Sequence, residues 1–185
     1  MIDETLEELR SAIDKAHTAL KRDLSRLRTG RANPDALESI RVDYYGSPTP
    51  INQLATVTVP EPRLLVIKPW DKASIIPIER AIQSSPLELS PQNDGELIRI
   101  PIPMLTEERR RELVKLAKRH GEECRVSIRK ARHDAKDMLG ALEKDGDVGR
   151  DEAERAMKKV EAIVQEGNAK VDAIVSAKEK DVMEL

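Results

Sequence analysis

The chain has 185 residues, of which 36% are charged and only 2% aromatic, and its formal net charge is −2. A charge balance so close to neutral excludes a uniformly basic protein, so a surface for polyanions must come from local segregation of charge. The single cysteine, Cys124, excludes an intramolecular disulfide and a cysteine cluster for zinc. With no apolar run of about 18 residues and no signal-peptide pattern, we expect a cytoplasmic protein without a membrane span.

Residues 2–29 are predicted to form a long helix. Apolar residues recur there at steps of three and four, which places them on one helical face. Acidic residues lie near the start and basic residues near the end, an order that complements the helix dipole. Gly30 is typical of a position just beyond a helix, and Pro34 cannot continue one.

Residues 31–103 differ sharply from this pattern, because they contain all eleven prolines and all the aromatic residues of the chain. Short β-prone runs alternate there with turn signals. The strands that they predict are Ile40–Tyr45, Ala55–Val59, Leu64–Lys68 and Leu97–Ile102. One helix is expected at Ile75–Gln83, with Ser74 as its N-cap. The helix face expected to pack inward contains Ile75, Ile78 and Ile82.

Two more long helices are predicted after Pro103. The first follows the N-cap residue Thr106 and ends near Lys144. Its packing seam is predicted to contain Leu113, Ala117, His120, Cys124, Ile128, Ala131, Ala135, Met138 and Leu142. The second covers about Arg150 to Met183. Its seam is predicted to contain Ala153, Met157, Val160, Val164, Gly167, Val171 and Ile174.

These patterns predict an α+β protein with two domains. Residues 1–29 and 105–185 would form a long three-helix bundle, and residues 30–104 an inserted β-rich domain with one helix. The chain crosses between them twice. The hinge residues predicted at the two crossings are Thr29, Gly30, Arg31, Pro101, Pro103 and Leu105. Such sparse linkage predicts reorientation of the domains, although Gly30 can also be interpreted simply as a helix stop.

No group of side chains predicts catalysis. His17, His120 and His133 fall on different helices or faces, and the metal, thiol and acyl-transfer motifs are absent from the sequence. His120 is expected to pack at a helix interface and His133 to be exposed. We therefore expect a protein that is not an enzyme, with no catalytic residue, metal site or cofactor.

A row of basic residues on the predicted helix after Thr106 points to a ligand. The row contains Arg111, Lys118, Arg125, Arg129, Arg132 and Lys136. Between Arg125 and Arg132 it includes no acidic residue, and arginine forks match phosphate oxygens. The row therefore suits the backbone of a structured nucleic acid, without the aromatic side chains that base stacking requires. The alternative is a solvated flank whose arginines pair with acids of the last helix.

Several separate motifs occur in order along the chain. They are Arg28–Ala32 with Pro34, Val42–Gly46 with Pro48–Pro50, Leu54 and Ala55 with Val57–Val59, Leu105–Arg110, and Arg125, Val126, Ile128 and Arg129 with Arg132–Ala135. Through these motifs, over essentially its whole length, the chain resembles the bacterial-type ribosome recycling factors. The resemblance implies a three-helix bundle with an inserted β/α/β domain, in an L shape similar to a transfer RNA.

The resemblance also implies a function. Such a factor binds the large ribosomal subunit after termination and, with elongation factor G and its GTP hydrolysis, splits the ribosome into subunits. The expected partners are therefore the ribosomal RNA of the large subunit and elongation factor G, and we expect a monomer. The alternative is a helical adaptor or holdase that binds proteins through its seams.

Specific arginines match the RNA-contacting positions of that family. Arg129 and Arg132 match on the central helix, whereas Arg28 and Arg31 match the motif beside the first crossing. Arg110 matches through Leu105–Arg110, although its helical phase places it off the basic row. With Arg125 from the row, the predicted RNA-binding residues number six. His133 stands where the family commonly has a second arginine, so the local charge is smaller here.

Overall fold

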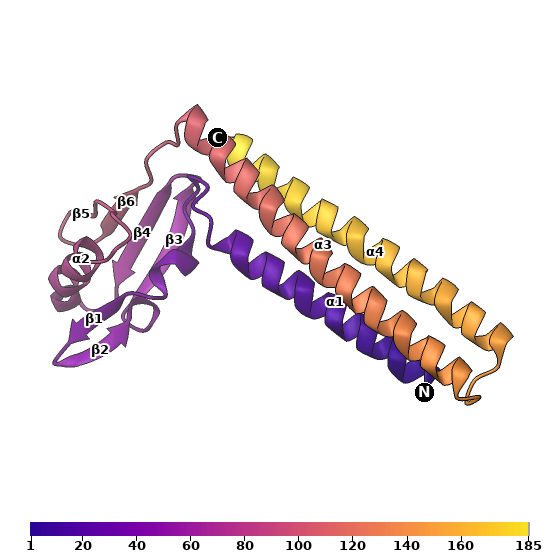
Figure 1. Cartoon of the computed structure of the whole chain (residues 1–185). Helices are drawn as coiled ribbons and strands as arrows, with labels where there is room; N and C mark the ends of the chain where they lie inside the picture. Colours follow the sequence, from indigo (N-terminus) through magenta and orange to yellow (C-terminus); the bar gives the residue numbers. More distant parts are fainter. Residues whose placement is uncertain (185) are drawn as a thin grey trace. The chain divides into compact units, whose positions relative to one another are not determined.

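The computed structural model describes residues 1–184 and divides into two compact units (Figure 1). One unit contains residues 1–29 and 106–184, and the other contains residues 30–105. The second boundary lies one residue later than the sequence suggested, because the helical unit resumes at Thr106, the N-cap of the next helix. Leu185 lies outside the described residues.

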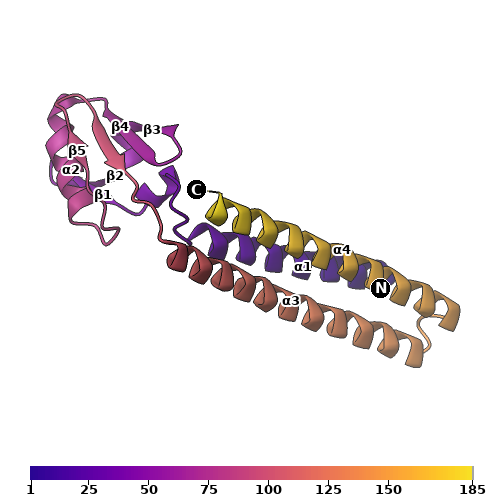
Figure 2. The same cartoon turned by 90° about the horizontal axis from the view of Figure 1, so that it is seen from above.

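The first unit consists of three long helices that lie side by side (Figures 1 and 2). They are α1 (Ile2–Ser25), α3 (Glu107–Lys144) and α4 (Arg150–Met183). The predicted bounds of α3 and α4 are confirmed, and the Thr106 hydroxyl accepts the Arg109 backbone N–H at 3.2 Å, as a capping residue should. The α+β fold class, a helical bundle with a small sheet domain, is therefore correct.

Helix α1 ends four residues before the predicted end at residue 29. The Leu27 backbone N–H donates to the Leu24 carbonyl at 3.1 Å, and the Ser25 hydroxyl donates to the Arg22 carbonyl at 2.7 Å. These three-residue bonds tighten the last turn and end the helix. Gly30 therefore belongs to the connection after the helix and does not cap it.

The buried face of α3 departs from the predicted seam toward its C-terminal end. Met138 is 48% exposed, whereas the next residue, Leu139, is fully buried. From Ile128 onward the predicted seam repeats every seven residues, and such a repeat drifts by about 20° per heptad around a straight α-helix. The same drift buries Val175 on α4, while the predicted Ile174 is only half-buried.

Two glycines bring the helices of the bundle close together. A Cβ atom built on Gly121 of α3 would lie 2.7 Å from Cγ2 of Val175 on α4. A Cβ atom built on Gly167 of α4 would lie 3.0 Å from Cγ2 of Ile13 on α1. Beside that contact, the buried His17 ring places Nε2 2.9 Å from the Gly167 carbonyl, a link from α1 to α4 that the sequence did not predict.

The second unit contains two antiparallel sheets and one α-helix. Strands β1 (Arg41–Tyr44) and β2 (Ser47–Pro50) form a hairpin. The larger sheet has the order β3-β4-β6-β5. Its strands are β3 (Ala55–Glu61), β4 (Leu64–Pro69), β5 (Gln92–Asn93) and β6 (Ile98–Pro101). Short 3-10 helices cover Pro34–Leu37, Ile51–Gln53 and Lys72–Ser74.

The predicted strands and helix of this unit are present, with two omissions and one wrong cap. Strand β2 was missed because two of its four residues are prolines, and β5 because it has only two residues. Helix α2 (Ile75–Gln83) has the predicted bounds and buries the three predicted isoleucines. Ser74 makes no capping hydrogen bond, since the preceding 3-10 helix runs directly into α2 and is capped by Asp71, which accepts the Ala73 N–H at 3.0 Å.

Candidate nucleic-acid interface

The central arginines of the basic row lie along the flank of α3, and each is paired with a carboxylate. Arg132 makes a forked contact with Glu161 of α4, in which Nη2 and Nε lie 2.7 and 3.0 Å from Oε1. Lys136 contacts the same carboxylate. A single side chain of α4 therefore holds two cations of α3.

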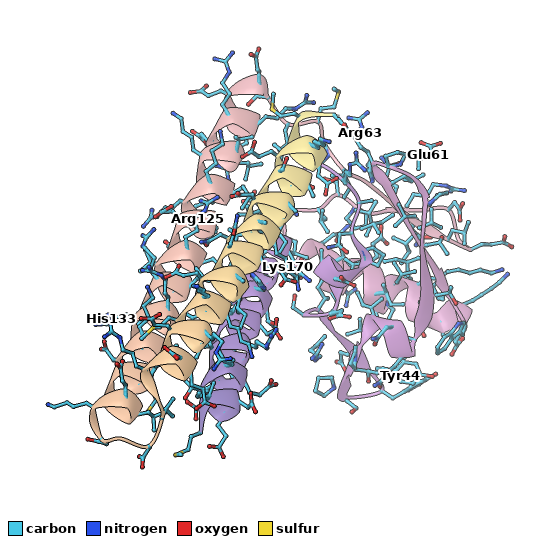
Figure 3. All side chains as sticks on the ribbon, turned by 90° about the vertical axis from the view of Figure 1, so that its right-hand side faces the viewer. Tyr44, Glu61, Arg63, Arg125, His133 and Lys170 are labelled. Atoms are coloured by element: carbon cyan, nitrogen blue, oxygen red, sulfur yellow. The ribbon has the colours of Figure 1, made fainter. Side chains whose placement is uncertain are left out.

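Arg125 and Arg129, the other two central arginines of the row, share a carboxylate on their own helix. Arg129 donates to Glu122 at 2.9 Å, and Arg125 contacts Glu122 at 3.5 Å. Arg125 also donates to Asp172 of α4. In Figure 3, Arg125 lies where α3 and α4 run side by side, whereas His133 projects from the outer side of α3. We call Arg125, Arg129, Arg132 and Lys136 the basic arc.

This geometry corrects the impression of an acid-free row. The sequence between Arg125 and Arg132 has no acid in the row, but Glu122 reaches both neighbouring arginines, and Glu161 and Asp172 reach the row from α4. The pairing with the last helix that the sequence left open is present. Four cations face three carboxylates, so the arc retains a small positive excess.

The ion pairs change the titration of the groups that form them. Hydrogen bonds from Arg132 and then Lys136 lower the pKa of Glu161 to about 2. The bond from Arg129 lowers the pKa of Glu122, while the carboxylates raise the pKa of Arg125 and Arg132. These shifts favour the charged forms of Glu161, Glu122, Arg125 and Arg132.

The remaining predicted RNA-binding arginines do not belong to the arc. Arg110 is half-buried in the first turn of α3, 15 residues and so about 22 Å of helix from Arg125. Arg28 and Arg31 are exposed in the connection that follows α1. The predicted residues thus fall into two groups, the arc and a set near the two chain crossings.

The sequence left open whether acids of the last helix pair with the row, but it did not identify which acids these are. The sequence contained part of the evidence for these partners. Glu161 and Asp172 lie beside the predicted seam of α4, where charged side chains can reach the next helix. Which arginine each would reach depends on how the antiparallel helices align, and that cannot be read from either segment alone.

The other residues considered for chemistry are accounted for by packing and local pairs. His120 is half-buried with Nδ1 3.2 Å from Glu123, and His133 is exposed beside Asp137 at 3.3 Å. Cys124 is buried, and burial raises the pKa of its thiol. Among residues 1–184, no group of three or more side chains is arranged to hold a metal ion. No helix in that range has the length and hydrophobicity to cross a membrane.

Both chain crossings are tied to one turn of the smaller unit. The Ala32 N–H donates to the Pro62 carbonyl at 2.8 Å, and the Ile102 N–H donates to the Arg63 carbonyl at 2.8 Å. Pro62 and Arg63 form the β3–β4 turn, which Figure 3 marks by Glu61 and Arg63. Gly30 has φ 78°, a left-handed conformation. Among the predicted hinge residues, Pro101 ends β6, whereas Pro103 and Leu105 lie between Ile102 and the Thr106 cap.

Comparison with known proteins agrees with this architecture. The sequence model of a family described as ribosome recycling factor matches residues 20–183. The chain is 58% identical to a ribosome-recycling factor of Sorangium cellulosum over the full length of both chains. It is 52% identical to that of Brevibacillus brevis, with 97% of each chain covered.

Two solved structures are similar over almost the whole chain. One is a solution structure of a ribosome recycling factor, with a TM-score of 0.77, 38% identity, and coverage of 100% of this chain and 98% of the other. The second has a TM-score of 0.66, 43% identity and 99% coverage of each chain. It presents the T. thermophilus ribosome recycling factor and E. coli elongation factor G bound to the E. coli post-termination complex. From these matches over its whole length, the chain belongs to the ribosome recycling factor family.

Proposed function

We propose that this protein binds the post-termination ribosome and, with elongation factor G and GTP, splits it into subunits. Family membership supports this proposal most strongly, together with the similar structure in which a family member is bound to a post-termination complex with elongation factor G. The protein acts as a cytoplasmic, non-enzymatic factor in this scheme, because the GTP is hydrolysed by its partner.

The basic arc is the proposed anchor on the RNA of the large subunit. Its cations occupy positions 125, 129, 132 and 136 of one helix and so extend over about 16 Å. A line of arginines at helical spacing contacts phosphates in succession without reading bases. Arg28, Arg31 and Arg110 are proposed to extend this contact near the chain crossings.

The two chain crossings are the proposed hinge between the domains. Because Ala32 and Ile102 are held by neighbouring carbonyls of the β3–β4 turn, the freedom of the crossings is confined to residues 26–31 and 103–105. Force applied to the inserted domain would then turn it as one body about these two short segments.

The RNA anchor is tested by measuring binding to purified large ribosomal subunits by co-sedimentation. We expect Arg132→Ala to weaken binding about tenfold, because the variant loses a charge-assisted contact with a phosphate. The slope of log affinity against log salt should fall between roughly 50 and 200 mM salt, by at most about one, because Arg132 is already paired with Glu161 in the free protein. Helicity should remain, since the Arg132 side chain is only half-buried, on the surface of the bundle.

Arg10→Ala is the matched control, because Arg10 is an exposed arginine of α1 on a different helix. It removes the same charge and should leave affinity within about twofold. Equal affinity of Arg132→Ala and the unmodified protein at moderate salt would remove Arg132 from the anchor. Binding that is insensitive to salt would instead favour a helical adaptor that recognises proteins.

A further inference from the structure

The carboxylate of Glu161 occupies the side of the Arg132 guanidinium that an RNA phosphate would use. Nε and Nη2 of Arg132 both donate to Glu161, and this pair of donors is the one that arginine offers to a phosphate in a forked contact. Asp172 accepts from the Nη2 group of Arg125 through a single contact. RNA and the two α4 carboxylates therefore compete for the same donors.

These ion pairs are weak enough to exchange. Arg132 and Glu161 are 41% and 47% exposed, and Asp172 is 65% exposed. Ion pairs with this exposure contribute little to stability, because water and salt screen them. The pairs can thus hold the arginine side chains in place in the free protein and still be displaced by a phosphate backbone.

The exchange also affects which polyanion can bind. With three carboxylates facing four cations, a single phosphate gains little over the carboxylate that it replaces. Several phosphates at fixed spacing displace several carboxylates together, and the rest of the interface holds them in register. The carboxylates therefore disfavour isolated anions and flexible strands relative to a folded RNA surface.

We propose that Glu161 and Asp172 are specificity-determining residues, which clamp the basic arc in the free protein and are exchanged for RNA phosphates on binding. This inference rests on the proposed function, because it assumes that the arc is the RNA anchor. The clamp lowers the affinity of the protein for ribosomal RNA, which lets the bound protein dissociate. Removal of the clamp therefore strengthens binding.

The salt dependence of binding provides a second signature. A phosphate that contacts an arginine releases its counterion, but the displaced carboxylate takes a cation up from solution. The net release is smaller than for an unpaired arginine, so the clamp makes the salt slope shallower. Replacing the carboxylate by an amide removes this uptake and makes the slope steeper by about one.

The experiment compares Glu161→Gln, Asp172→Asn and the unmodified full-length protein in binding to purified large ribosomal subunits, across a salt series. Each amide keeps an oxygen that can accept from the arginine but removes the charge. We expect affinity to rise about three- to fivefold for each variant, the amount that corresponds to losing an exposed competing ion pair. Far-UV circular dichroism checks that each variant is folded.

Glu154→Gln is the matched control. Glu154 lies on α4 seven residues before Glu161, so it shares the same flank, and its ion pair at 3.5 Å is with Arg150 of its own helix. It changes the net charge equally and should leave affinity within about twofold. An equal gain for Glu154→Gln would assign the effect to net charge and overturn the clamp.

Two further outcomes separate the clamp from the proposed function. If Arg132→Ala weakens binding while Glu161→Gln and Asp172→Asn leave it unchanged or weaken it, the clamp is wrong and the RNA anchor stands. If none of these variants alters binding to the subunit, the anchor and the clamp both fail, because both depend on the arc.

Discussion

At the scale of single residues, the bundle depends on positions where a side chain would not fit. Gly121 is buried within α3, where glycine is normally unfavourable by about 1 kcal/mol relative to alanine. Its missing Cβ gives room to the branched side chain of Val175, which has little freedom to turn away. Glycine at this position therefore lowers the helix propensity of α3 but allows close contact between α3 and α4.

We predict that Gly121→Ala destabilises the bundle by about 1–2 kcal/mol, because overpacking exceeds the gain in helix propensity. Val175→Ala alone should cost about 2 kcal/mol. In the double variant the new methyl group enters the space left by Val175. The double variant should therefore lose about 1 kcal/mol less stability than the sum of the losses in the two single variants. Urea unfolding followed by far-UV circular dichroism measures all three.

Gly140→Ala supplies the control on the same helix. Nothing lies within 4 Å of a Cβ atom built on Gly140, so alanine should stabilise the bundle by up to about 1 kcal/mol. If Gly121→Ala raised the stability of the bundle, the prediction would be wrong, and α3 and α4 would separate easily at that contact.

At the scale of elements, the turn between β5 and β6 is organised by one carboxylate. Asp94 accepts the backbone N–H groups of Leu97 and Glu96 at 2.8 and 3.0 Å, and it is paired with Arg99 of β6. The backbone bonds to Leu97 and Glu96 and then the Arg99 bond lower the pKa of Asp94 from 3.8 to about 2. The charged form is therefore favoured by folding of this turn.

A depressed pKa in the folded state stabilises the protein above the unfolded pKa and loses that effect as pH falls toward the folded value. We predict that Asp94→Asn lowers the urea midpoint of the inserted domain at neutral pH. The difference from the unmodified protein should shrink between about pH 4 and pH 2 and vanish below it. Fluorescence of Trp70, the single tryptophan of the chain, follows this domain.

Glu96→Gln is the comparison for this turn, because Glu96 and its partner Lys72 are both well exposed, 3.6 Å apart. Its midpoint should follow that of the unmodified protein at every pH. A difference for Asp94→Asn that persists below pH 2 would mean that the amide disturbs the turn by shape and not by charge.

At the scale of the whole molecule, two separate cores are joined by two short stretches of chain. One core contains leucine, isoleucine, valine and alanine side chains of three helices, and the other contains side chains from both sheets and α2. In the proposed function, motion at the crossings converts force from elongation factor G into splitting. Gly30, with φ 78°, lies in one of these crossings.

We predict that Gly30→Ala leaves binding to the large subunit within about twofold but slows ribosome splitting several-fold. An L-residue pays about 1–2 kcal/mol at such a left-handed φ, which restricts the conformations available to the crossing. Light scattering of ribosomes with elongation factor G and GTP measures the rate of splitting.

Gly95→Ala is the matched control for the hinge. Gly95 has φ 90°, a Cβ there meets nothing within 4 Å, and the residue lies in the β5–β6 turn. It adds similar strain without touching a crossing, so splitting should proceed at the normal rate. Equal rates for Gly30→Ala and the unmodified protein would remove Gly30 from the mechanism.

The sequence by itself determined the helices of the bundle, helix α2 and the central strands of the larger sheet. These elements follow from periodicity and from turn residues, which act over a few neighbouring positions. The predicted seams of α3 and α4 were wrong by one residue at Leu139 and Val175, because the repeat and the helix do not have the same period. On α3 the predicted His120 is only half-buried, and the next residue, Gly121, is the buried one.

Only the tertiary structure decided what the arginines contact. The pairs of Arg132 with Glu161 and of Arg125 with Asp172 join residues 29 and 47 positions apart, and the buried contact of His17 with Gly167 spans 150. Such contacts depend on the alignment of helices that the pattern of one segment cannot specify. The sequence could therefore predict a basic row on one helix, whereas its pairing with Glu161 and Asp172 became visible only when α4 lay beside α3.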